Sequence, residues 1–351
     1  MFSPSSLTDL RNTGFDQIID VRSPSEFAED HVPGAINLPV LDDAERARVG
    51  TLYKQVSPFD ARKTGAALVF RNAATHIDTA LAGYEGGWKP LVYCWRGGQR
   101  SGAFAWMLRE IGWPAETIAG GYKTYRRLIV KALYEGDLNV RLIRIGGYTG
   151  TAKTEILGRL SALGIQVIDL EAMARHRGSL LGGLDVPQPS QKGFETDLIT
   201  ALDRLNLSKP VIVEAESSKI GAITLPPALW GAMKSAPVIE ISAPLEARAR
   251  YLAQAYESVL RDGEALKDKL SPLSAHRSRE LMQLWSDLID RDDRVALCRS
   301  LAADHYDPSY EKSAGAFREF IAARFDTPDL TPAAQDRLAD RIAGWLQSAT
   351  I

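Results

Sequence analysis

The sequence has little cysteine, and this scarcity excludes several classes of protein. Its 351 residues include two cysteines, Cys94 and Cys298, whose spacing fits neither a zinc site nor a disulfide framework. No apolar run reaches the roughly 20 residues that a membrane-spanning helix needs. The first stretch of the chain also lacks the basic and apolar segments of a signal peptide. We therefore expect a reduced, cytoplasmic protein with no membrane partner.

The chain also lacks an excess of charge of either sign. Its formal net charge is −2, with 45% hydrophobic and 25% charged residues, which is an ordinary globular composition. Any binding of nucleic acid must therefore come from local basic patches rather than from the overall charge. A length of 351 residues exceeds what one ordinary core supports and favours two domains of common size.

Short apolar runs that alternate with helical patterns predict an α/β protein with parallel sheets. For the first domain, 1–135, the expected strands are 15–21, 35–39 and 90–94, and the expected helices are 66–82, 101–111 and 122–134. A polar segment at 135–139 marks the predicted domain boundary. For the second domain, 136–351, the expected strands are 140–145, 164–169, 210–214 and 238–242, followed by a mostly helical region from Pro244 onward.

The strand that ends at Cys94 is followed by a glycine-rich loop and then by a predicted helix. Backbone N–H groups of such a loop converge on one point, and the start of the helix adds partial positive charge, so the loop forms an anion cradle. These groups and the nearby arginines should lower the pKa of the Cys94 thiol and make it a nucleophile. A buried structural cysteine is the alternative, which the loop composition disfavours. The predicted anion-binding residues are Arg96, Gly97, Gly98, Gln99, Arg100 and Ser101.

The Cys94 loop, together with the stretch at 18–39, resembles the rhodanese family. That resemblance implies that Cys94 carries sulfur or selenium as a persulfide-type adduct. Arg100 lies six residues after Cys94, one more than in common single-domain sulfurtransferases, and this longer loop is similar to that of rhodanese-fold phosphatases. A larger cradle would also suit a phosphate-bearing donor such as selenophosphate. The length of the loop alone does not choose between these ligands.

A second glycine-rich loop follows the strand predicted at 140–145. Its sequence matches the P-loop pattern G-x-x-x-x-G-K-[ST] at every fixed position except Ala152, which replaces glycine. In a P-loop the backbone amides cradle phosphates, the lysine neutralises charge and the final hydroxyl can hold Mg²⁺. A glycine-rich turn that only packs is the alternative. The predicted diphosphate-binding residues are Gly147, Tyr148, Thr149, Gly150, Thr151, Ala152, Lys153 and Thr154.

Four further residues are candidates for chemistry or RNA contact in the second domain. Glu214 and Glu216 end a predicted strand, where a P-loop fold places its second acidic motif, and either could act as a base or bind Mg²⁺ together with Thr154. Their alternative is a solvated carboxylate. His176 and Arg177 could contact RNA or a diphosphate, or could lie at a solvated helix end. Mg²⁺ is thus an option, and no obligatory cofactor is evident.

The order of the two domains resembles the tRNA 2-selenouridine synthase family, and the resemblance covers nearly the whole chain. The segments that carry it are 93–101, 120–126, 147–150, 169–171, 176–179, 188–191, 194–195, 213–221 and 305–310. We therefore expect an N-terminal rhodanese-like parallel-sheet domain and a C-terminal P-loop α/β domain with a mostly helical C-terminal region.

The resemblance implies a two-step reaction on 2-thiouridine at the wobble position of a tRNA. Geranyl diphosphate first alkylates the sulfur, and selenium from selenophosphate then replaces the S-geranyl group. Geranyl diphosphate and selenophosphate are thus the implied substrates, tRNA is the implied partner, and an enzyme that supplies selenophosphate is a further possible partner. Cys94 would serve the second step, and the P-loop would hold the diphosphate leaving group.

A rhodanese-fold phosphatase or sulfurtransferase joined to a P-loop ATPase or kinase remains the alternative function. Ala152 weakens the kinase reading, because a kinase needs an intact nucleotide grip. Basic residues beside the predicted boundary could form a surface for tRNA phosphates: Lys123, Arg126, Arg127 and Lys131. The basic residues of the helical region, among them Arg248, are interspersed with acidic residues and are interpreted mainly as a solvated helical face.

Overall fold

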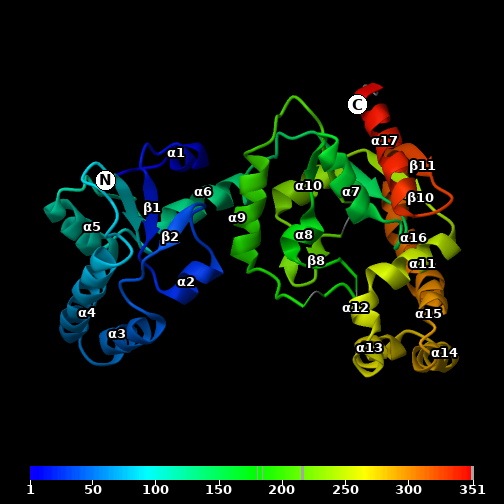
Figure 1. Cartoon of the computed structure of the whole chain (residues 1–351), viewed down its shortest axis with the longest axis horizontal. Helices are drawn as coiled ribbons and strands as arrows, with labels where there is room; N and C mark the ends of the chain where they lie inside the picture. Colours follow the sequence, from blue (N-terminus) through cyan, green and yellow to red (C-terminus); the bar gives the residue numbers. More distant parts are fainter. Residues whose placement is uncertain (180, 184, 215–216, 349–351) are drawn as a thin grey trace. The chain divides into compact units, whose positions relative to one another are not determined.

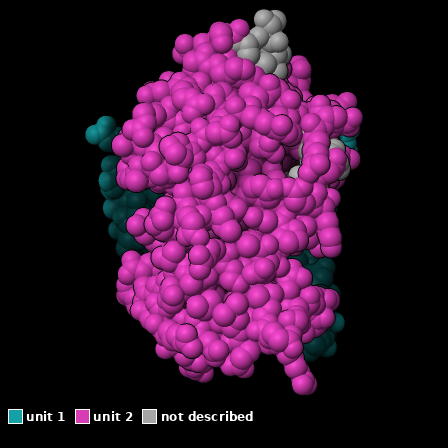
Figure 2. All heavy atoms as spheres, turned by 90° about the vertical axis from the view of Figure 1, so that its right-hand side faces the viewer, with its two compact units in different colours: residues 1–136, 189–202 teal, residues 137–188, 203–351 magenta. Residues whose placement is uncertain are grey.

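The computed structural model describes residues 1–179, 181–183, 185–214 and 217–348, which form two compact units. Unit 1 comprises residues 1–136 and 189–202, and unit 2 comprises residues 137–188 and 203–351 (Figure 2). The sequence predicts a single division at 135/136. In the structure the segment 189–202 groups with unit 1, because helix α9 (Gln191–Leu202) packs on helix α6 (Tyr122–Tyr134).

Unit 1 contains a four-stranded parallel sheet in the order β2-β1-β3-β4. Its strands are β1 (Gln17–Asp20), β2 (Ala35–Asn37), β3 (Pro90–Tyr93) and β4 (Glu116–Thr117). Ile19 pairs with Val92 in the centre of the sheet, and both are completely buried. Since β3 ends at Tyr93, the sheet delivers Cys94 to the edge formed by the carboxyl ends of its strands, where ligands bind in open α/β sheets.

The helices of unit 1 follow the prediction in part. Besides α6 and α9, the α-helices of unit 1 are α1 (Leu7–Arg11), α2 (Pro24–Glu29), α3 (Asp43–Gln55), α4 (Pro58–Asp78) and α5 (Gln99–Ile111). Helix α4 begins eight residues before the predicted start, and α3 was not predicted. Helix α3 has no buried side chain among its residues, so it lacks the apolar stripe on which a prediction depends. It lies beside α4 (Figure 1).

A buried polar network attaches α9 to the rest of unit 1. Thr196 of α9 and Tyr122 of α6 both donate hydrogen bonds to the Asp30 carboxylate, at 2.6 Å and 2.7 Å. Arg126 forms an ion pair with Glu195 of α9, whose side chain is 3% exposed. Arg126 was a candidate for binding tRNA phosphates, but its guanidinium lies within this network. The network explains why a segment distant in sequence belongs to unit 1.

Replacing Glu195 by alanine is expected to destabilise unit 1. The change leaves the largely buried Arg126 guanidinium without its closest carboxylate, and breaking such a pair costs about 3 kcal/mol. Lys192→Ala is the matched control, because Lys192 pairs with Glu29 on the surface and such pairs contribute less than about 1 kcal/mol. Urea unfolding and amide hydrogen exchange in α9 measure the difference. Equal unfolding free energies for the two variants would contradict the structural role given to this network.

Unit 2 contains a five-stranded parallel sheet in the order β11-β10-β5-β7-β6. Its strands are β5 (Leu142–Gly146), β6 (Gln166–Ile168), β7 (Val211–Glu214), β10 (Val238–Ser242) and β11 (Ile321–Asp326), and β8 (Lys219–Ile220) forms a separate hairpin with β9 (Ile223–Thr224). Strand β11 was not predicted, because it follows a long helical region and occupies the edge of the sheet. Its Arg324 pairs with Glu240 of β10 at 2.7 Å. The α/β prediction with parallel sheets is confirmed for both units.

Helices surround this sheet and form a separate cluster beyond it. They are α7 (Lys153–Ala162), α8 (Leu170–Ala174), α10 (Pro227–Ser235), α11 (Leu245–Ala255), α12 (Glu257–Leu260), α13 (Gly263–Leu270), α14 (Arg279–Asp290), α15 (Arg294–Leu301), α16 (Asp307–Ala314) and α17 (Pro332–Ser348). Trp285 and Cys298 are buried in the helical cluster. Burial raises the pKa of the Cys298 thiol to about 12, which makes it unreactive at neutral pH. Among the described residues, no helix is long and apolar enough to cross a membrane.

Candidate active site with two anion-binding loops

The Cys94 loop is held in place by close backbone packing. Gly97 has φ of +64°, and a Cβ added there would lie 2.7 Å from the carbonyl oxygen of Ile118. A Cβ at Gly121, which has φ of +59°, would lie 2.2 Å from the carbonyl oxygen of Cys94. Both positions therefore require glycine. The amide of Tyr122 donates to the Cys94 carbonyl oxygen at 2.9 Å, so the start of α6 fixes the loop.

The electrostatic environment of Cys94 favours the thiolate. Burial by itself raises the pKa of the thiol, but hydrogen bonds from Ser101, the charge of Arg100 and the Arg96 amide together lower the pKa below its ordinary value. The Ser101 hydroxyl donates to the Cys94 sulfur at 3.2 Å. The loop thus combines a nucleophile with donors that suit an anion, as the sequence predicts, although the two roles themselves stay a prediction.

A buried carboxylate orients Arg100. Glu26 accepts from Arg100 at 2.9 Å and also pairs with Arg46 at 2.9 Å. Burial raises the pKa of Glu26, but the two guanidinium groups lower it below its ordinary value, so the carboxylate is ionised. Two cations share this one carboxylate, and the local charge stays positive beside the Cys94 loop. The sequence contains Glu26 within the rhodanese-like stretch, but only the fold shows that it positions Arg100.

Other predicted residues of this loop lie at its surface or at the start of α5. Arg96 is exposed, and Gln99 and Arg100 begin α5. The Trp95 ring lies 5.2 Å from the Tyr122 ring, centroid to centroid, as expected for a residue that packs the loop.

Removal of the Ser101 hydroxyl is expected to raise the pKa of Cys94. Because the thiolate is the nucleophile, Ser101→Ala should shift the pH dependence of alkylation by iodoacetamide to higher pH and slow the reaction at neutral pH. Ser101→Thr retains a hydroxyl and serves as the control. Mass spectrometry of the peptide that contains Cys94, across a pH series, measures the rate. A midpoint that does not rise in Ser101→Ala would contradict the role of this hydrogen bond.

The P-loop keeps its shape although Ala152 replaces a glycine. Gly147 has φ of +143°, and a Cβ there would lie 2.4 Å from the carbonyl oxygen of Ile241, so glycine is required. Ala152 has φ of +58°, a left-handed conformation that costs an alanine about 1 kcal/mol. Its methyl group packs in the core of unit 2 with Ile156, which offsets part of this cost. The turn before α7 is therefore retained.

Side chains within and around the P-loop fix its backbone. The Lys153 ammonium donates to the carbonyl oxygen of Gly147 at 3.1 Å. Arg248 donates to the carbonyl oxygen of Thr149 at 3.2 Å. It also forms a bidentate ion pair with Asp307, with hydrogen bonds of 2.8 Å and 2.9 Å. Interpreting Arg248 as part of a solvated helical face is wrong, because the residue is 4% exposed and supports the loop. The position of Arg248 within the sequence of α11 does not predict this contact.

The structure shows the surroundings of Glu214 and Thr154, two residues predicted to bind Mg²⁺. The Glu214 carboxylate accepts from the Leu170 amide at 2.9 Å, and its burial and the neighbouring Asp169 raise its pKa. Glu214 is therefore not a solvated carboxylate, since it is buried and accepts a backbone hydrogen bond. Thr154 donates to Glu171 at 3.4 Å, so the hydroxyl predicted for Mg²⁺ faces a carboxylate that was not among the predicted site residues.

The described ranges hold no group of three His, Cys, Asp or Glu side chains arranged to bind a metal. The oxygen atoms of Thr154 and Glu171 are nevertheless of the type that Mg²⁺ prefers. Glu216, the other predicted acidic residue, lies outside the described residues.

His176 and Arg177 stabilise their own segment of unit 2. His176 accepts a hydrogen bond from the Gly178 amide at 3.1 Å, and burial lowers the pKa of its ring. Arg177 donates to the carbonyl oxygen of Ala255 at 2.6 Å and lies 4.8 Å from the centre of the Tyr256 ring. These contacts attach the segment to the end of α11, so Arg177 is not a solvated helix end.

Comparisons with known proteins match both loops. A family model described as the tRNA 2-selenouridine synthase AAA domain matches residues 140–285, and the rhodanese-like domain model matches residues 3–128. The chain is 35% identical to the tRNA 2-selenouridine synthase of Nitrosomonas europaea, over 86% of this chain and 81% of that protein. It is 33% identical to the protein of the same name from Alcanivorax borkumensis, over 84% of this chain and 88% of the relative.

Solved structures also show similarity to separate parts of the chain. The N-terminal domain of a putative ATP/GTP binding protein from Clostridium difficile is 32% identical over 34% of this chain and 95% of that one, with a TM-score of 0.30. Shikimate kinase from Bacteroides thetaiotaomicron is 14% identical over 59% of this chain and 98% of that one, with a TM-score of 0.29.

Proposed function

The chain belongs to the tRNA 2-selenouridine synthase family, and on this premise we propose that its two anion-binding loops serve successive steps of selenium incorporation into tRNA. The protein is a transferase that modifies tRNA. In the first proposed step, the sulfur of a wobble 2-thiouridine attacks geranyl diphosphate. The sulfur–carbon bond forms, the carbon–oxygen bond to diphosphate breaks, and the base loses one proton.

In the second proposed step, selenium replaces the S-geranyl group. The Cys94 thiolate attacks the phosphorus of selenophosphate, so that a sulfur–phosphorus bond forms and the phosphorus–selenium bond breaks. The released hydroselenide attacks the base carbon that bears the S-geranyl group, and geranylthiolate leaves. The proton on hydroselenide passes to that thiolate, and water later hydrolyses the cysteinyl phosphate to inorganic phosphate and thiol.

The single observation that supports this assignment is that a thiol with a lowered pKa and an oriented guanidinium lie in the same glycine-rich segment. Arg100 follows Cys94 by six residues and is oriented by Glu26, and Ser101 donates to the sulfur. These features stabilise a thiolate both as a nucleophile and as the leaving group when the cysteinyl phosphate is hydrolysed.

The P-loop would hold the diphosphate of the first step. Its backbone amides and the start of α7 attract the diphosphate, and Lys153 would exchange its carbonyl partner, Gly147, for a diphosphate oxygen. A leaving diphosphate needs charge stabilisation but no placement of a γ-phosphate for hydrolysis. Thr154 and Glu171 would hold Mg²⁺, which when bound supplies further neutralisation of diphosphate charge.

A time course with wild-type protein tests this proposal. The protein is incubated with thiolated tRNA, geranyl diphosphate and selenophosphate, and the tRNA nucleosides are quantified by mass spectrometry. We expect S-geranyl-2-thiouridine to rise first and to fall as 2-selenouridine appears. Formation of 2-selenouridine at full rate without geranyl diphosphate would overturn the two-step assignment. Hydrolysis of aryl phosphates that depends on Cys94, without selenium transfer, would instead favour the phosphatase alternative.

A further inference from the structure

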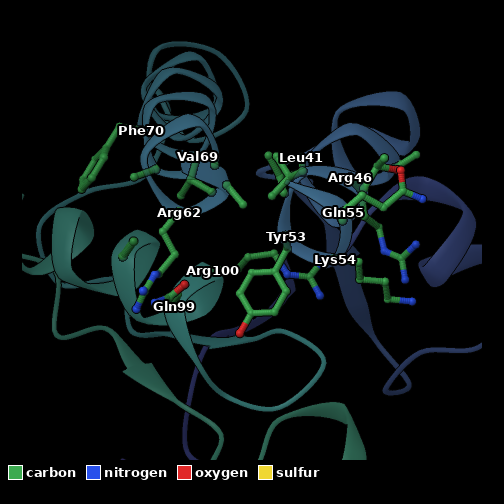
Figure 3. Close-up of a pocket in the computed structure, with 18 residues that line it drawn as sticks. Leu41, Arg46, Tyr53, Lys54, Gln55, Arg62, Val69, Phe70, Gln99 and Arg100 are labelled. Atoms are coloured by element: carbon green, nitrogen blue, oxygen red, sulfur yellow. The ribbon is translucent and has the colours of Figure 1, made fainter. Parts of the chain in front are cut away.

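Unit 1 contains a large cavity to which the two proposed steps assign no role. Its volume is about 1020 Å³, and α3, α4 and the first turns of α5 line it (Figure 3). Pockets that bind small molecules usually have volumes of roughly 300–1,000 Å³. The cavity is therefore large enough for an extended organic group, and it lies entirely within one unit.

The inner wall of the cavity is apolar and contains small residues. Leu41, Val69 and Ala103 contribute aliphatic surface. Gly65 of α4 faces Val49 of α3, and a Cβ at Gly65 would lie 3.3 Å from a methyl group of Val49. Helices α3 and α4 thus approach closely at this point, and the rings of Tyr53 and Phe70 add further apolar surface to the lining. Such a wall favours an apolar chain over a polar ligand.

The remaining lining carries positive charge. The described lining residues include no carboxylate. They include four cationic side chains, those of Arg46, Lys54, Arg62 and Arg100. Arg46 and Arg100 pair with Glu26, whereas neither Lys54 nor Arg62 forms an ion pair within the described part of the chain. Figure 3 shows Arg62 extending from α4 toward Gln99 at the start of α5. An apolar chain attached to an anionic molecule matches this combination.

The cavity and the Cys94 loop share a wall. Gln99 and Arg100 line the cavity and also belong to the first turn of α5, where Ser101 donates to the Cys94 sulfur. A molecule whose apolar chain occupies the cavity would therefore present the other end of that chain to the Cys94 loop. By contrast, the cavity beside Gly147 of the P-loop has a volume of about 260 Å³ and is lined by several charged side chains.

We propose that this cavity binds the geranyl chain of the S-geranylated tRNA during the second step. The inference rests on the proposed function, because the S-geranyl group is the apolar group that this step expels. Burial of the chain holds the reacting base carbon beside the Cys94 loop, and Lys54 and Arg62 contact phosphates of the tRNA. The cavity is thus a specificity site for an isoprenoid substituent.

A substitution at the rim tests this inference with little effect on the core. Ala66 lines the cavity and is exposed, and Ala67 is the next residue of α4, exposed but not part of the lining. Ala66→Trp should fill the cavity, and Ala67→Trp is the matched control. Each variant is given selenophosphate and tRNA that already carries S-geranyl-2-thiouridine. We expect Ala66→Trp to lower kcat/KM on the order of tenfold or more and Ala67→Trp to leave it unchanged.

An S-methyl substrate separates loss of the chain site from general damage. The methyl group places no chain in the cavity, so Ala66→Trp and wild type should convert S-methylated tRNA at the same rate. Equal rates for Ala66→Trp and wild type on the geranylated tRNA would overturn the inference. Loss of activity on both substrates, or loss of the geranylation step alone, would overturn it as well. Failure of wild-type protein to convert geranylated tRNA would instead refute the proposed function on which the inference rests.

Discussion

Cys94→Ala is expected to abolish formation of 2-selenouridine while S-geranyl-2-thiouridine accumulates. Without the thiolate, no group in the loop attacks the phosphorus of selenophosphate, and selenide is not released. Removal of a catalytic nucleophile commonly lowers a rate by about 10³-fold or more. Geranylation should stay near the wild-type rate, because Cys94 and the P-loop lie in different units. Mass spectrometry of the tRNA nucleosides reports both products in one measurement.

Labelled selenophosphate identifies the bond that Cys94 forms. A donor labelled on phosphorus should label wild-type protein transiently at Cys94, and a donor labelled on selenium should label the tRNA but not the protein. Cys298→Ser serves as the control, since Cys298 is buried in the helical cluster of unit 2. This variant should show the wild-type labelling of both the protein and the tRNA. Selenium found on Cys94 would contradict the cysteinyl phosphate. Normal 2-selenouridine from Cys94→Ala would show that the thiolate has no catalytic role.

Lys153→Ala is expected to impair geranylation by about 10²-fold, because the ammonium stabilises charge on the departing diphosphate. The contact between Lys153 and the Gly147 carbonyl shows that the side chain reaches across the loop in which the diphosphate would bind. Lys234→Ala, at an exposed position in the last turn of α10, is the matched control and should retain the wild-type rate. Rates are measured with thiolated tRNA and geranyl diphosphate alone. An unchanged rate in Lys153→Ala would remove the P-loop from the first step.

Features that depend on local chain chemistry could be predicted from the sequence. The Cys94 loop and the P-loop each join a buried strand to a helix through glycines, and the sequence predicted both of these strand-to-loop-to-helix junctions, in which it also predicts an anion cradle. Helix α6 has the predicted bounds, Tyr122–Tyr134, because Tyr122, Tyr125, Ile129 and Leu133 form a continuous buried stripe. The family assignment was also confirmed, since two relatives in that family are 35% and 33% identical over 86% and 84% of this chain.

Features that depend on tertiary contacts could not be predicted. Arg248 has an ordinary place in an amphipathic helix, and only the fold brings it to the Thr149 carbonyl. Glu26 became part of the site through its contact with Arg100, which is 74 residues away in the sequence. Helix α9 joins unit 1 through the carboxylates of Asp30 and Glu195. No local pattern encodes these partners, since each depends on how distant segments pack.

The cavity illustrates the same limit at the level of function. Three helices line it, and one of them, α3, has no buried side chain and was not predicted. The packing of α3 beside α4, which forms the cavity, therefore had no signature in the sequence.

The most direct test of whether each loop serves its own step is an assay of the second step alone. Both Cys94→Ala and Lys153→Ala are given selenophosphate and tRNA that already carries S-geranyl-2-thiouridine, and 2-selenouridine is quantified by mass spectrometry. The two-loop mechanism predicts that Lys153→Ala forms 2-selenouridine at the wild-type rate and that Cys94→Ala forms none. Equal loss of activity in both variants, or activity retained only in Cys94→Ala, would contradict it.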